Sequence, residues 1–292
     1  MIAIDLGSNT IRFIEYDGKR WGNSFEKIVK TAETIRSSGR IGAAAERRVI
    51  DAICEAKGHL DFSSQPVVGY TTAAMRMAQN AHEVLERIRL ETGVPFTIID
   101  AGKEAALTLR AVCYRLEILG IVPSSFVLAD IGGGSTELIY VRDEDSSSIS
   151  LDAGIVTLSE GADSESALRE RISRFTEDVR ASLPAGQATL VLTAGTPTTI
   201  AAYLCGMDYE TYDPAKINGY RLGLASCYEV YKELLAMEEE DRIRFVGVGR
   251  EHLIMAGILM VCAIYEAMGC NEAIVVDDGL REGIALEYFE LS

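Results

Sequence analysis

Two glycine-rich loops contain residues that could bind phosphate. The first reads Asp5-Leu6-Gly7-Ser8-Asn9-Thr10, and the second reads Asp130-Ile131-Gly132-Gly133-Gly134-Ser135-Thr136. Glycine leaves neighbouring backbone N–H groups uncovered, so a phosphate can approach several donors, and the Ser and Thr hydroxyls add more. Neither loop is a P-loop, because the G-x-x-x-x-G-K-[S/T] pattern is absent. The first loop alone is more typical of a tight hairpin with glycine at positive φ. Two copies, each opened by Asp, favour phosphate binding.

Two carboxylates flank the second loop and could bind a cation. Asp130 and Glu137 are seven positions apart, at the two ends of a predicted hairpin turn. Mg²⁺ takes one or two carboxylates together with phosphate oxygens and waters, so this pair predicts a site for Mg²⁺ or another divalent cation. Asp5 is a weaker candidate of the same kind. The alternative role for these carboxylates is hydrogen bonding to nearby N–H groups of the loop.

Two strand-to-helix turns in the second half of the chain could also face an anion. One contains Ala194-Gly195-Thr196 and the other Asp277-Asp278-Gly279. The first turn of a helix presents unpaired N–H groups, so Gly195 and Thr196 are candidate phosphate-binding residues. Each turn alone is more often only a helix cap.

The hydrophobic pattern predicts the elements that position these residues. Strands alternate with amphipathic helices, which indicates an α/β fold. We expect strands at 2–4, 11–16, 67–70, 96–99, 126–129, 137–141, 189–192 and 273–276, and helices at 43–57, 81–91, 103–116, 165–182, 198–204, 229–237, 251–268 and 280–291. Residues 142–148 are predicted as an acidic, Ser-rich turn. The two glycine-rich loops both begin Asp-x-Gly and lie 125 residues apart, which indicates two similar domains, 1–117 and 118–292. The final helix could pack back on the first domain.

Composition and charge exclude several classes of function. The chain has 292 residues, 48% of them hydrophobic, which is typical of a folded globular protein. Its net charge of −16 argues against nucleic acid or a basic membrane-binding surface as a partner. No apolar run is long enough to span a bilayer, and the N-terminus lacks a signal-peptide pattern, so we expect a cytoplasmic protein. Six scattered cysteines and three isolated histidines predict reduced core thiols and no zinc motif.

One segment departs from the overall negative charge. Residues 12–48 contain nine basic and five acidic side chains. An anionic small molecule or polymer could bind there, with Arg12, Lys19, Arg36 and Arg40 guiding a longer phosphate chain. An ordinary solvated helix face is an equally good interpretation of this charge pattern.

Six motifs occur in an order that resembles the exopolyphosphatase/guanosine pentaphosphate phosphatase (Ppx/GppA) family. They are 5–10, Tyr70-Thr71-Thr72-Ala73-Ala74-Met75-Arg76, Gly102-Lys103-Glu104-Ala105, 130–138, 194–196 and 277–283. The resemblance covers essentially the whole chain. It implies two actin-like (ribonuclease H-like) domains facing each other across a cleft, and hydrolysis of the terminal phosphate of polyphosphate or guanosine pentaphosphate. Longer members carry a further helical region, whose functions are not expected here.

The resemblance also assigns catalytic roles. Glu104 matches the family's catalytic glutamate, which would accept a proton from the attacking water. The family usually has two glutamates before the alanine, whereas here the pair is Lys103-Glu104. Alignment on Gly102 would instead put Ala105 at the catalytic position, but the first alignment needs no gap. Arg76 matches the family's arginine and would stabilise charge on the phosphate oxygens. The simpler roles are a first-turn helix carboxylate for Glu104 and a surface salt bridge for Arg76.

These observations leave three hypotheses of function. The first is a Mg²⁺-dependent phosphohydrolase acting on polyphosphate or on guanosine penta- or tetraphosphate. The second is a catalytically weak or inactive regulator that binds phosphate or guanosine penta- or tetraphosphate, as the substitution at Lys103 suggests. The third is an ATP-using kinase of the actin-like fold, for which we find no adenine-site signature. The apolar segment 253–268 could be core or the interface of a homodimer.

Overall fold

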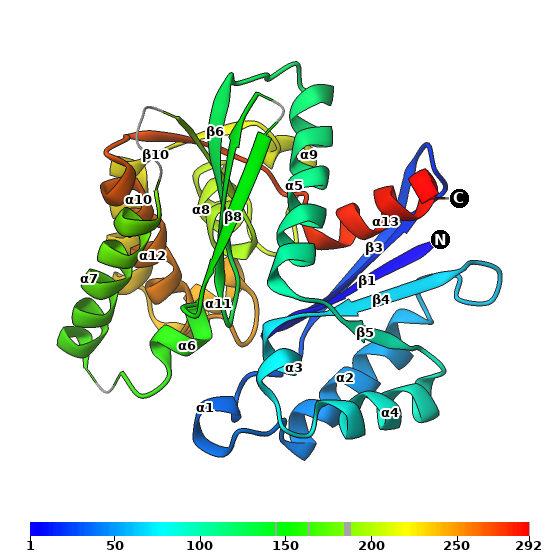
Figure 1. The fold of residues 1–292 in the computed structure, drawn as a ribbon. Helices are drawn as coiled ribbons and strands as arrows, with labels where there is room; N and C mark the ends of the chain where they lie inside the picture. Colours follow the sequence, from blue (N-terminus) through cyan, green and yellow to red (C-terminus); the bar gives the residue numbers. More distant parts are fainter. Residues whose placement is uncertain (144, 163, 184–187, 292) are drawn as a thin grey trace. The chain divides into compact units, whose positions relative to one another are not determined.

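The computed structural model describes residues 1–143, 145–162, 164–183 and 188–291, which form two compact α/β units (Figure 1). Unit 1 comprises Met1–Ala111 and Gly279–Ser292, and unit 2 comprises Val112–Asp278. The chain passes from one unit to the other inside helix α5 (Ala101–Ile118) and again between Asp278 and Gly279. The first crossing therefore lies six residues before the expected boundary at 117/118.

Unit 1 is built on a five-stranded sheet in the order β3-β2-β1-β4-β5. β1, β2 and β3 form an antiparallel meander, and β4 and β5 run parallel to β1. The strands are β1 (Ile2–Leu6), β2 (Thr10–Tyr16), β3 (Trp21–Ile28), β4 (Val67–Thr71) and β5 (Phe96–Ile98). The helices wholly within this unit are α1 (Ile35–Ser38), α2 (Ala43–Ala56), α3 (Ala73–Met77), α4 (Ala81–Thr92) and α13 (Leu280–Leu291).

The last helix of the chain, α13, packs on β1 and β2 of unit 1. The paired α2 and α4 lie on the other face of this sheet (Figure 1). The start of α5 also binds α13, through the ion pairs Lys103–Glu287 and Arg110–Glu290. The end of α5 instead binds unit 2, where Arg115 pairs with Asp278. These contacts explain why the boundary between the units falls within one helix.

Unit 2 is built on a six-stranded sheet in the order β10-β11-β9-β6-β7-β8. Its strands are β6 (Ser125–Ile131), β7 (Thr136–Arg142), β8 (Asp145–Leu151), β9 (Thr189–Thr193), β10 (Tyr220–Gly223) and β11 (Glu272–Val275). Its helices are α6 (Ile155–Ser159), α7 (Glu165–Ser182), α8 (Gly195–Leu204), α9 (Pro214–Ile217), α10 (Leu224–Ala236), α11 (Glu239–Val246) and α12 (Ile254–Met268). Apart from the edge strand β10, this sheet has the same strand order and directions as that of unit 1.

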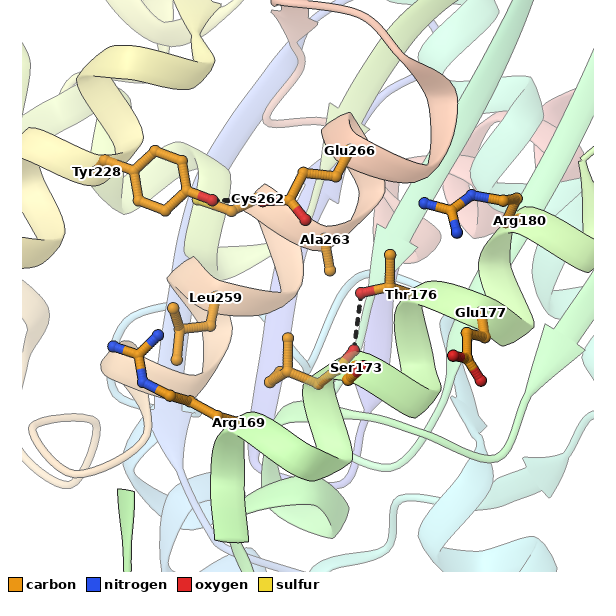
Figure 2. A pocket seen from close by; sticks show the side chains of 11 residues that line it. Arg169, Ser173, Thr176, Glu177, Arg180, Tyr228, Leu259, Cys262, Ala263 and Glu266 are labelled. Carbon is orange, nitrogen blue, oxygen red and sulfur yellow. Dashed lines mark hydrogen bonds between the residues drawn. The ribbon is translucent and has the colours of Figure 1, made fainter. Parts of the chain in front are cut away.

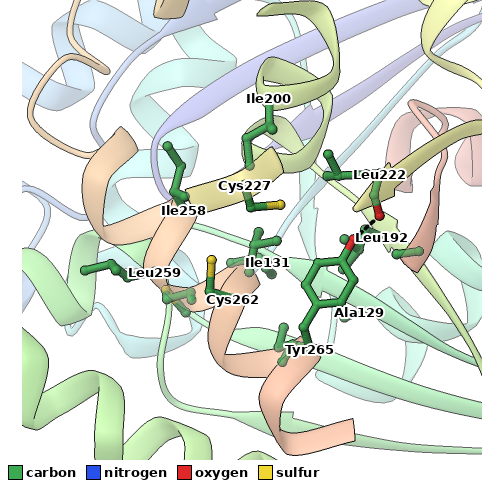
Figure 3. Packing of buried hydrophobic residues seen from close by; sticks show 14 of the residues in the cluster. Ala129, Ile131, Leu192, Ile200, Leu222, Cys227, Ile258, Leu259, Cys262 and Tyr265 are labelled. Atoms are coloured by element: carbon green, nitrogen blue, oxygen red, sulfur yellow. Dashed lines mark hydrogen bonds between the residues drawn. The ribbon is translucent and has the colours of Figure 1, made fainter. Parts of the chain in front are cut away.

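The apolar helix α12 belongs to the core of unit 2. It is buried along most of its length and packs against α7, α8 and α10. Figure 3 shows Cys262 and Tyr265 of α12 close to Cys227 of α10, with the Tyr265 hydroxyl donating to the Leu222 carbonyl at 2.6 Å. A helix that is apolar on all sides is expected in a core, and the packing of α12 accounts for its apolar side chains.

Several sequence-based expectations about elements and cysteines need correction. Residues 142–148 were predicted as a turn, but 145–151 form strand β8, and β3 and β10 were also missed. β8 is a polar, largely exposed edge strand, and β3 is an edge strand with no buried residue, so both lack the alternating apolar pattern by which strands are recognised. Three of the six free cysteines, Cys54, Cys113 and Cys205, are exposed rather than in the core. In the part of the chain that the structure describes, no helix has the length and apolar character needed to cross a membrane.

Candidate active site

The candidate catalytic residues of unit 1 follow strands that end at the same edge of its sheet. Leu6, Thr71 and Ile98 are in register at the ends of the parallel strands β1, β4 and β5. The first glycine loop follows β1, α3 with Arg76 follows β4, and α5 with Glu104 follows β5. The carboxyl edge of parallel strands is the usual place for ligand-binding loops in open α/β sheets.

The first loop is held so that its carbonyls and its amides have different roles. The Ser8 carbonyl accepts from the Ala32 N–H at 2.9 Å, and the Asn9 carbonyl accepts from the N–H groups of residues 29 and 30 at 2.8 and 3.0 Å. The Thr31 hydroxyl donates to the Gly7 carbonyl at 2.6 Å. The Ser8 and Asn9 N–H groups donate to none of the described residues. The loop therefore offers two backbone donors to a ligand.

Arg76 and Glu104 contact each other. Arg76 Nη1 donates to Glu104 Oε2 at 2.7 Å and to the Ile99 carbonyl at 3.0 Å. Glu104 is only 8% exposed, and Asp100, just before α5, accepts from the Lys103 N–H at 2.7 Å, as an N-cap does. A guanidinium beside a carboxylate favours its ionised form, which is the form a general base needs. Nε and Nη2 of Arg76 donate to no residue in the described ranges, so they could bind phosphate oxygens.

Lys103, which replaces a glutamate of the family pattern, forms an ion pair with Glu287 of α13. The same two helices touch through their backbones further along. An ideal Cβ on Gly283 of α13 would lie 2.1 Å from the Leu107 carbonyl oxygen of α5, so no side chain fits there. Lys103 and Gly283 thus both fix α5, the helix that carries Glu104, against α13.

The second loop, in unit 2, has the same construction as the first. The Gly132 N–H donates to the Ser135 carbonyl at 3.0 Å, just as the Gly7 N–H donates to the Thr10 carbonyl at 3.0 Å. The Gly132 and Gly133 carbonyls accept from N–H groups at the start of α6, and the N–H groups of Gly133 and Gly134 donate to none of the described residues. The 125-residue repeat extends to the hydrogen bonds that hold the loops. The Thr157 N–H donates to the Gly133 carbonyl, and the equivalent Ala32 N–H donates to the Ser8 carbonyl.

Close backbone packing explains the glycine at position 154, beside the second loop. None of Gly7, Gly132, Gly133 and Gly134 has a positive φ, so a left-handed hairpin conformation does not account for them. An ideal Cβ on Gly154 would lie 2.5 Å from the Gly133 carbonyl carbon and 2.6 Å from the Gly134 nitrogen. Only glycine at 154 lets the chain before α6 approach the second loop closely enough to hold it.

The two hairpins differ in the charge opposite their aspartates. Asp130 lies directly across the β6–β7 pair from Glu137, whereas Asp5 lies across the β1–β2 pair from Arg12. Directly opposed residues have Cβ atoms about 4.5–5.5 Å apart. Glu137 is 2% exposed, and its Oε1 accepts from the hydroxyls of Ser135 and Ser150 at 2.8 Å each. Two carboxylates on neighbouring strands, one of them oriented by two hydroxyls, suit a hard divalent cation, so the second hairpin fits Mg²⁺ better than the first.

The turn at Gly195 and Thr196 lies beside the second loop in the sheet of unit 2. Thr193, at the end of β9, is the register partner of Asp130. Ala194 has φ 77° and ψ −180°, a conformation costing about 1–3 kcal/mol for a residue other than glycine. The N–H groups of Gly195 and Thr196, in the first turn of α8, donate to no described residue. This backbone is therefore held in a strained conformation with two amides available to a ligand.

The turn at 277–279 is already engaged by protein groups. Asp278 receives two hydrogen bonds from Arg115, at 2.6 and 3.0 Å. The Gly279 N–H, at the start of α13, donates to Glu282 Oε2 at 2.9 Å. A carboxylate of the same helix thus occupies the position where an anion would bind. Of the two roles considered for the 277–279 turn, the contacts favour a cap of helix α13 over an anion site.

The basic segment 12–48 is largely neutralised within unit 1. Most of its positive side chains pair with carboxylates, three of which lie outside the segment. The pairs are Arg12–Glu26, Lys27–Glu55, Arg40–Glu83, Arg47–Glu91 and Arg48–Glu33. The interpretation as a solvated, paired face therefore fits Arg12 and Arg40 better than a path for a phosphate chain.

A groove elsewhere in unit 2 is lined by α7, α10 and α12 (Figure 2). It has a volume of about 360 Å³, and inside it the Tyr228 hydroxyl donates to Glu266 Oε1 at 2.5 Å. Its lining includes none of the predicted site residues. Burial, together with the Glu266 carboxylate, raises the pKa of the Tyr228 hydroxyl, so this group stays protonated at neutral pH.

Sequence reasoning missed residues that support the candidate site from a distance. Thr31 and Gly154 hold the two loops, Ser150 orients Glu137, and Glu287 holds Lys103. Extending the 125-residue repeat beyond the loops would have pointed to the segments that contain Thr31 and Gly154. No local signal indicates Glu287, because its partner lies 184 residues away in the chain.

Comparison with known proteins agrees with this architecture. The model of the Ppx/GppA phosphatase family matches residues 24–291. Exopolyphosphatase 1 of Mycobacterium leprae is 29% identical over 302 residues, covering 97% of this chain and 88% of that protein. The guanosine-5'-triphosphate,3'-diphosphate pyrophosphatase of Aeromonas hydrophila is 26% identical over 304 residues, covering 97% of this chain and 58% of that protein.

Solved structures show the same relationship. The crystal structure of the Aquifex aeolicus member of the Ppx/GppA family is 29% identical, with a TM-score of 0.76, and the match covers 99% of this chain and 97% of that one. The predicted α/β fold with two actin-like units is thereby confirmed. The resemblance inferred from the six motifs is also confirmed: the chain belongs to the Ppx/GppA phosphatase family.

Proposed function

We propose that this protein is a phosphohydrolase that removes the terminal phosphate from inorganic polyphosphate or from guanosine pentaphosphate. The observation that carries the proposal is the buried Glu104, held by Arg76 at the sheet edge where the first glycine loop also begins. The family membership and the relatives described above support a phosphatase acting on one of these two substrates.

In the proposed reaction, water attacks the terminal phosphorus and the bond to the bridging oxygen breaks. The Glu104 carboxylate accepts the proton of the attacking water, and the bridging oxygen leaves with the electron pair on the shortened substrate. Arg76 binds phosphate oxygens through Nε or Nη2 while Nη1 holds Glu104 in place. General-base catalysis of this kind contributes about 10²–10⁴ in rate.

The backbone donors would bind the phosphates of the substrate. We assign phosphate binding to the first loop (Gly7, Ser8, Asn9, Thr10), the second loop (Gly132, Gly133, Gly134, Ser135, Thr136) and the α8 turn (Gly195, Thr196). The backbone donors available for it are the N–H groups of residues 8, 9, 133, 134, 195 and 196, which donate to no described residue. Asp130 and Glu137 would hold Mg²⁺. When bound, the cation supplies positive charge to phosphate oxygens in a protein whose own net charge is −16.

The hypothesis of an inactive regulator rested on Lys103. Since Lys103 forms an ion pair with Glu287 and leaves Glu104 paired with Arg76, its presence does not argue for loss of turnover. A regulator then becomes one outcome of the experiment below.

The test compares phosphate release by wild type, Glu104→Gln and Glu117→Gln, with each substrate and with Mg²⁺ present or chelated. Glu117 is an exposed residue of the same helix, which makes it a matched control. We expect wild type and Glu117→Gln to be equally active and Glu104→Gln to lose about 10²–10⁴ in rate. Equal activity of all three proteins would exclude Glu104 as the base. Tight substrate binding by calorimetry with no hydrolysis by wild type would identify a regulator instead.

A further inference from the structure

Three side chains of types that can bind metals lie close together in unit 2, outside the candidate active site. Glu239 is the first residue of α11, and Glu251 and His252 lie in the turn that leads into α12. One ligand atom from each of the three lies within 4.8 Å of the other two. This cluster is not predicted by any sequence pattern, because its histidine is isolated and a carboxylate 13 residues earlier forms no recognisable metal motif.

The distances in this cluster suit metal ligands better than hydrogen-bond partners. His252 Nε2 lies 3.6 Å from Glu239 Oε1 and 3.7 Å from Glu251 Oε1. An N–H···O hydrogen bond is about 2.7–3.2 Å long, so the imidazole donates to neither carboxylate. Zinc–ligand bonds of about 2.0–2.2 Å in tetrahedral geometry place neighbouring ligand atoms roughly 3.4 Å apart. A shift of a few tenths of an ångström would bring all three atoms around one ion.

Glu251 is already oriented for such an ion. The residue is 8% exposed, and its Oε2 accepts from the Gly249 N–H at 2.5 Å. Arg242 Nη1 donates to the Glu251 carbonyl at 3.3 Å, which fixes the backbone at this position. Oε1, the oxygen nearest His252, accepts no hydrogen bond from the residues that the structure describes. Oε1 is therefore available to bind an ion.

We propose that Glu239, Glu251 and His252 form a site for a Zn²⁺ ion, with water as a fourth ligand. An imidazole with two carboxylates suits zinc, whereas Mg²⁺ prefers oxygen ligands throughout, so this site differs in chemistry from the Asp130–Glu137 pair. The ion would join the start of α11 to the turn before α12. Its role is therefore structural, and the site is independent of the proposed phosphatase activity.

The test uses protein stripped of metal by a chelator and then titrated with Zn²⁺ by calorimetry. The variants are His252→Ala and Glu239→Gln, whose side chains are 67% and 57% exposed, so both variants should fold. His82→Ala, at an exposed histidine of α4, is the matched control. We expect one Zn²⁺ per chain and a raised melting temperature for wild type and His82→Ala. His252→Ala should bind at least tenfold more weakly and show no rise, and Glu239→Gln should also bind more weakly.

Two further measurements distinguish a specific zinc site from adventitious binding of zinc at the exposed cysteines. Co²⁺ in place of Zn²⁺ should give the visible absorption of a tetrahedral site in wild type but not in His252→Ala, and Mg²⁺ at the same concentration should leave the melting temperature unchanged. Absence of stoichiometric Zn²⁺ binding by wild type, or binding that His252→Ala and His82→Ala affect equally, would overturn the proposal.

Discussion

The contact between Gly283 and Leu107 predicts that one added methyl group will disturb both stability and activity. An ideal Cβ at position 283 would lie 2.1 Å from the Leu107 carbonyl oxygen and 2.5 Å from its carbonyl carbon. Real Cβ atoms essentially never come within 3.0 Å of such a neighbour, so the backbones of α5 and α13 must separate by at least 3.0 − 2.1 = 0.9 Å. Both obstacles are backbone atoms, and no side-chain rotation can relieve the clash.

The size of both effects follows from this displacement. Overpacking of a well-packed interface costs about 1–3 kcal/mol, which should appear as a lower free energy of unfolding for Gly283→Ala. Glu104 lies one helical turn before Leu107 on the same helix, so it should move by a comparable distance. A displacement of about 1 Å in a catalytic group can cost about 100-fold in rate. We therefore expect a loss of that order in kcat, with a smaller change in KM.

Urea unfolding followed by circular dichroism, and phosphate release at saturating substrate, measure the two effects. The control is Gly223→Ala, because the nearest atoms to a Cβ at that position are 3.9 Å away and the residue has φ −90°. An unchanged unfolding midpoint for Gly283→Ala would refute the close packing of α13 on α5. A destabilised variant with unchanged kcat would instead show that this contact does not position Glu104.

Three further perturbations have outcomes that the contacts predict. Lys103→Glu should lower the free energy of unfolding by at most about 1 kcal/mol, because the ion pair with Glu287 is partly exposed. The double variant Lys103→Glu/Glu287→Lys should recover the urea midpoint of wild type, and failure to do so would mean that these two side chains do not interact. Ser150→Ala removes a hydrogen bond to Glu137 and should raise the Mg²⁺ concentration for half-maximal phosphate release about 10–100-fold. Ser146→Ala, on the same strand, should leave that concentration unchanged, and equal effects of the two variants would contradict a role for Glu137 in holding the cation. Hydrogen bonds from Thr211, and then from Arg244, lower the pKa of Asp208 from 3.8 to about 2, so its stabilising contribution is fully present above pH 3.8 and is lost as pH falls through about 2. Asp208→Asn should lower the urea midpoint at pH 7, and its difference from wild type should shrink as pH falls toward 2; a constant difference over this range would refute this linkage.

The architecture followed from local sequence patterns wherever a strand or helix has a buried face. The helix predicted at 165–182 and the final helix at 280–291 have the observed bounds, and the parallel strands were located to within one or two residues. Burial of one face imposes a periodic apolar pattern that a single sequence displays. The edge strands β3 and β8 bury little surface and display no such pattern, so only their pairing in the sheets identifies them.

The sequence alone determined the candidate groups: two glycine-rich loops that begin Asp-x-Gly, a glutamate and an arginine in an order typical of the family, and acidic residues flanking one loop. Tertiary structure alone decided how these groups are held. Arg76 meets Glu104, Lys103 meets Glu287, and Glu239 meets His252 because the folded chain brings distant segments together. A side chain's chemistry is a local property, readable from its residue type, whereas its partner depends on long-range packing that no short stretch of sequence encodes.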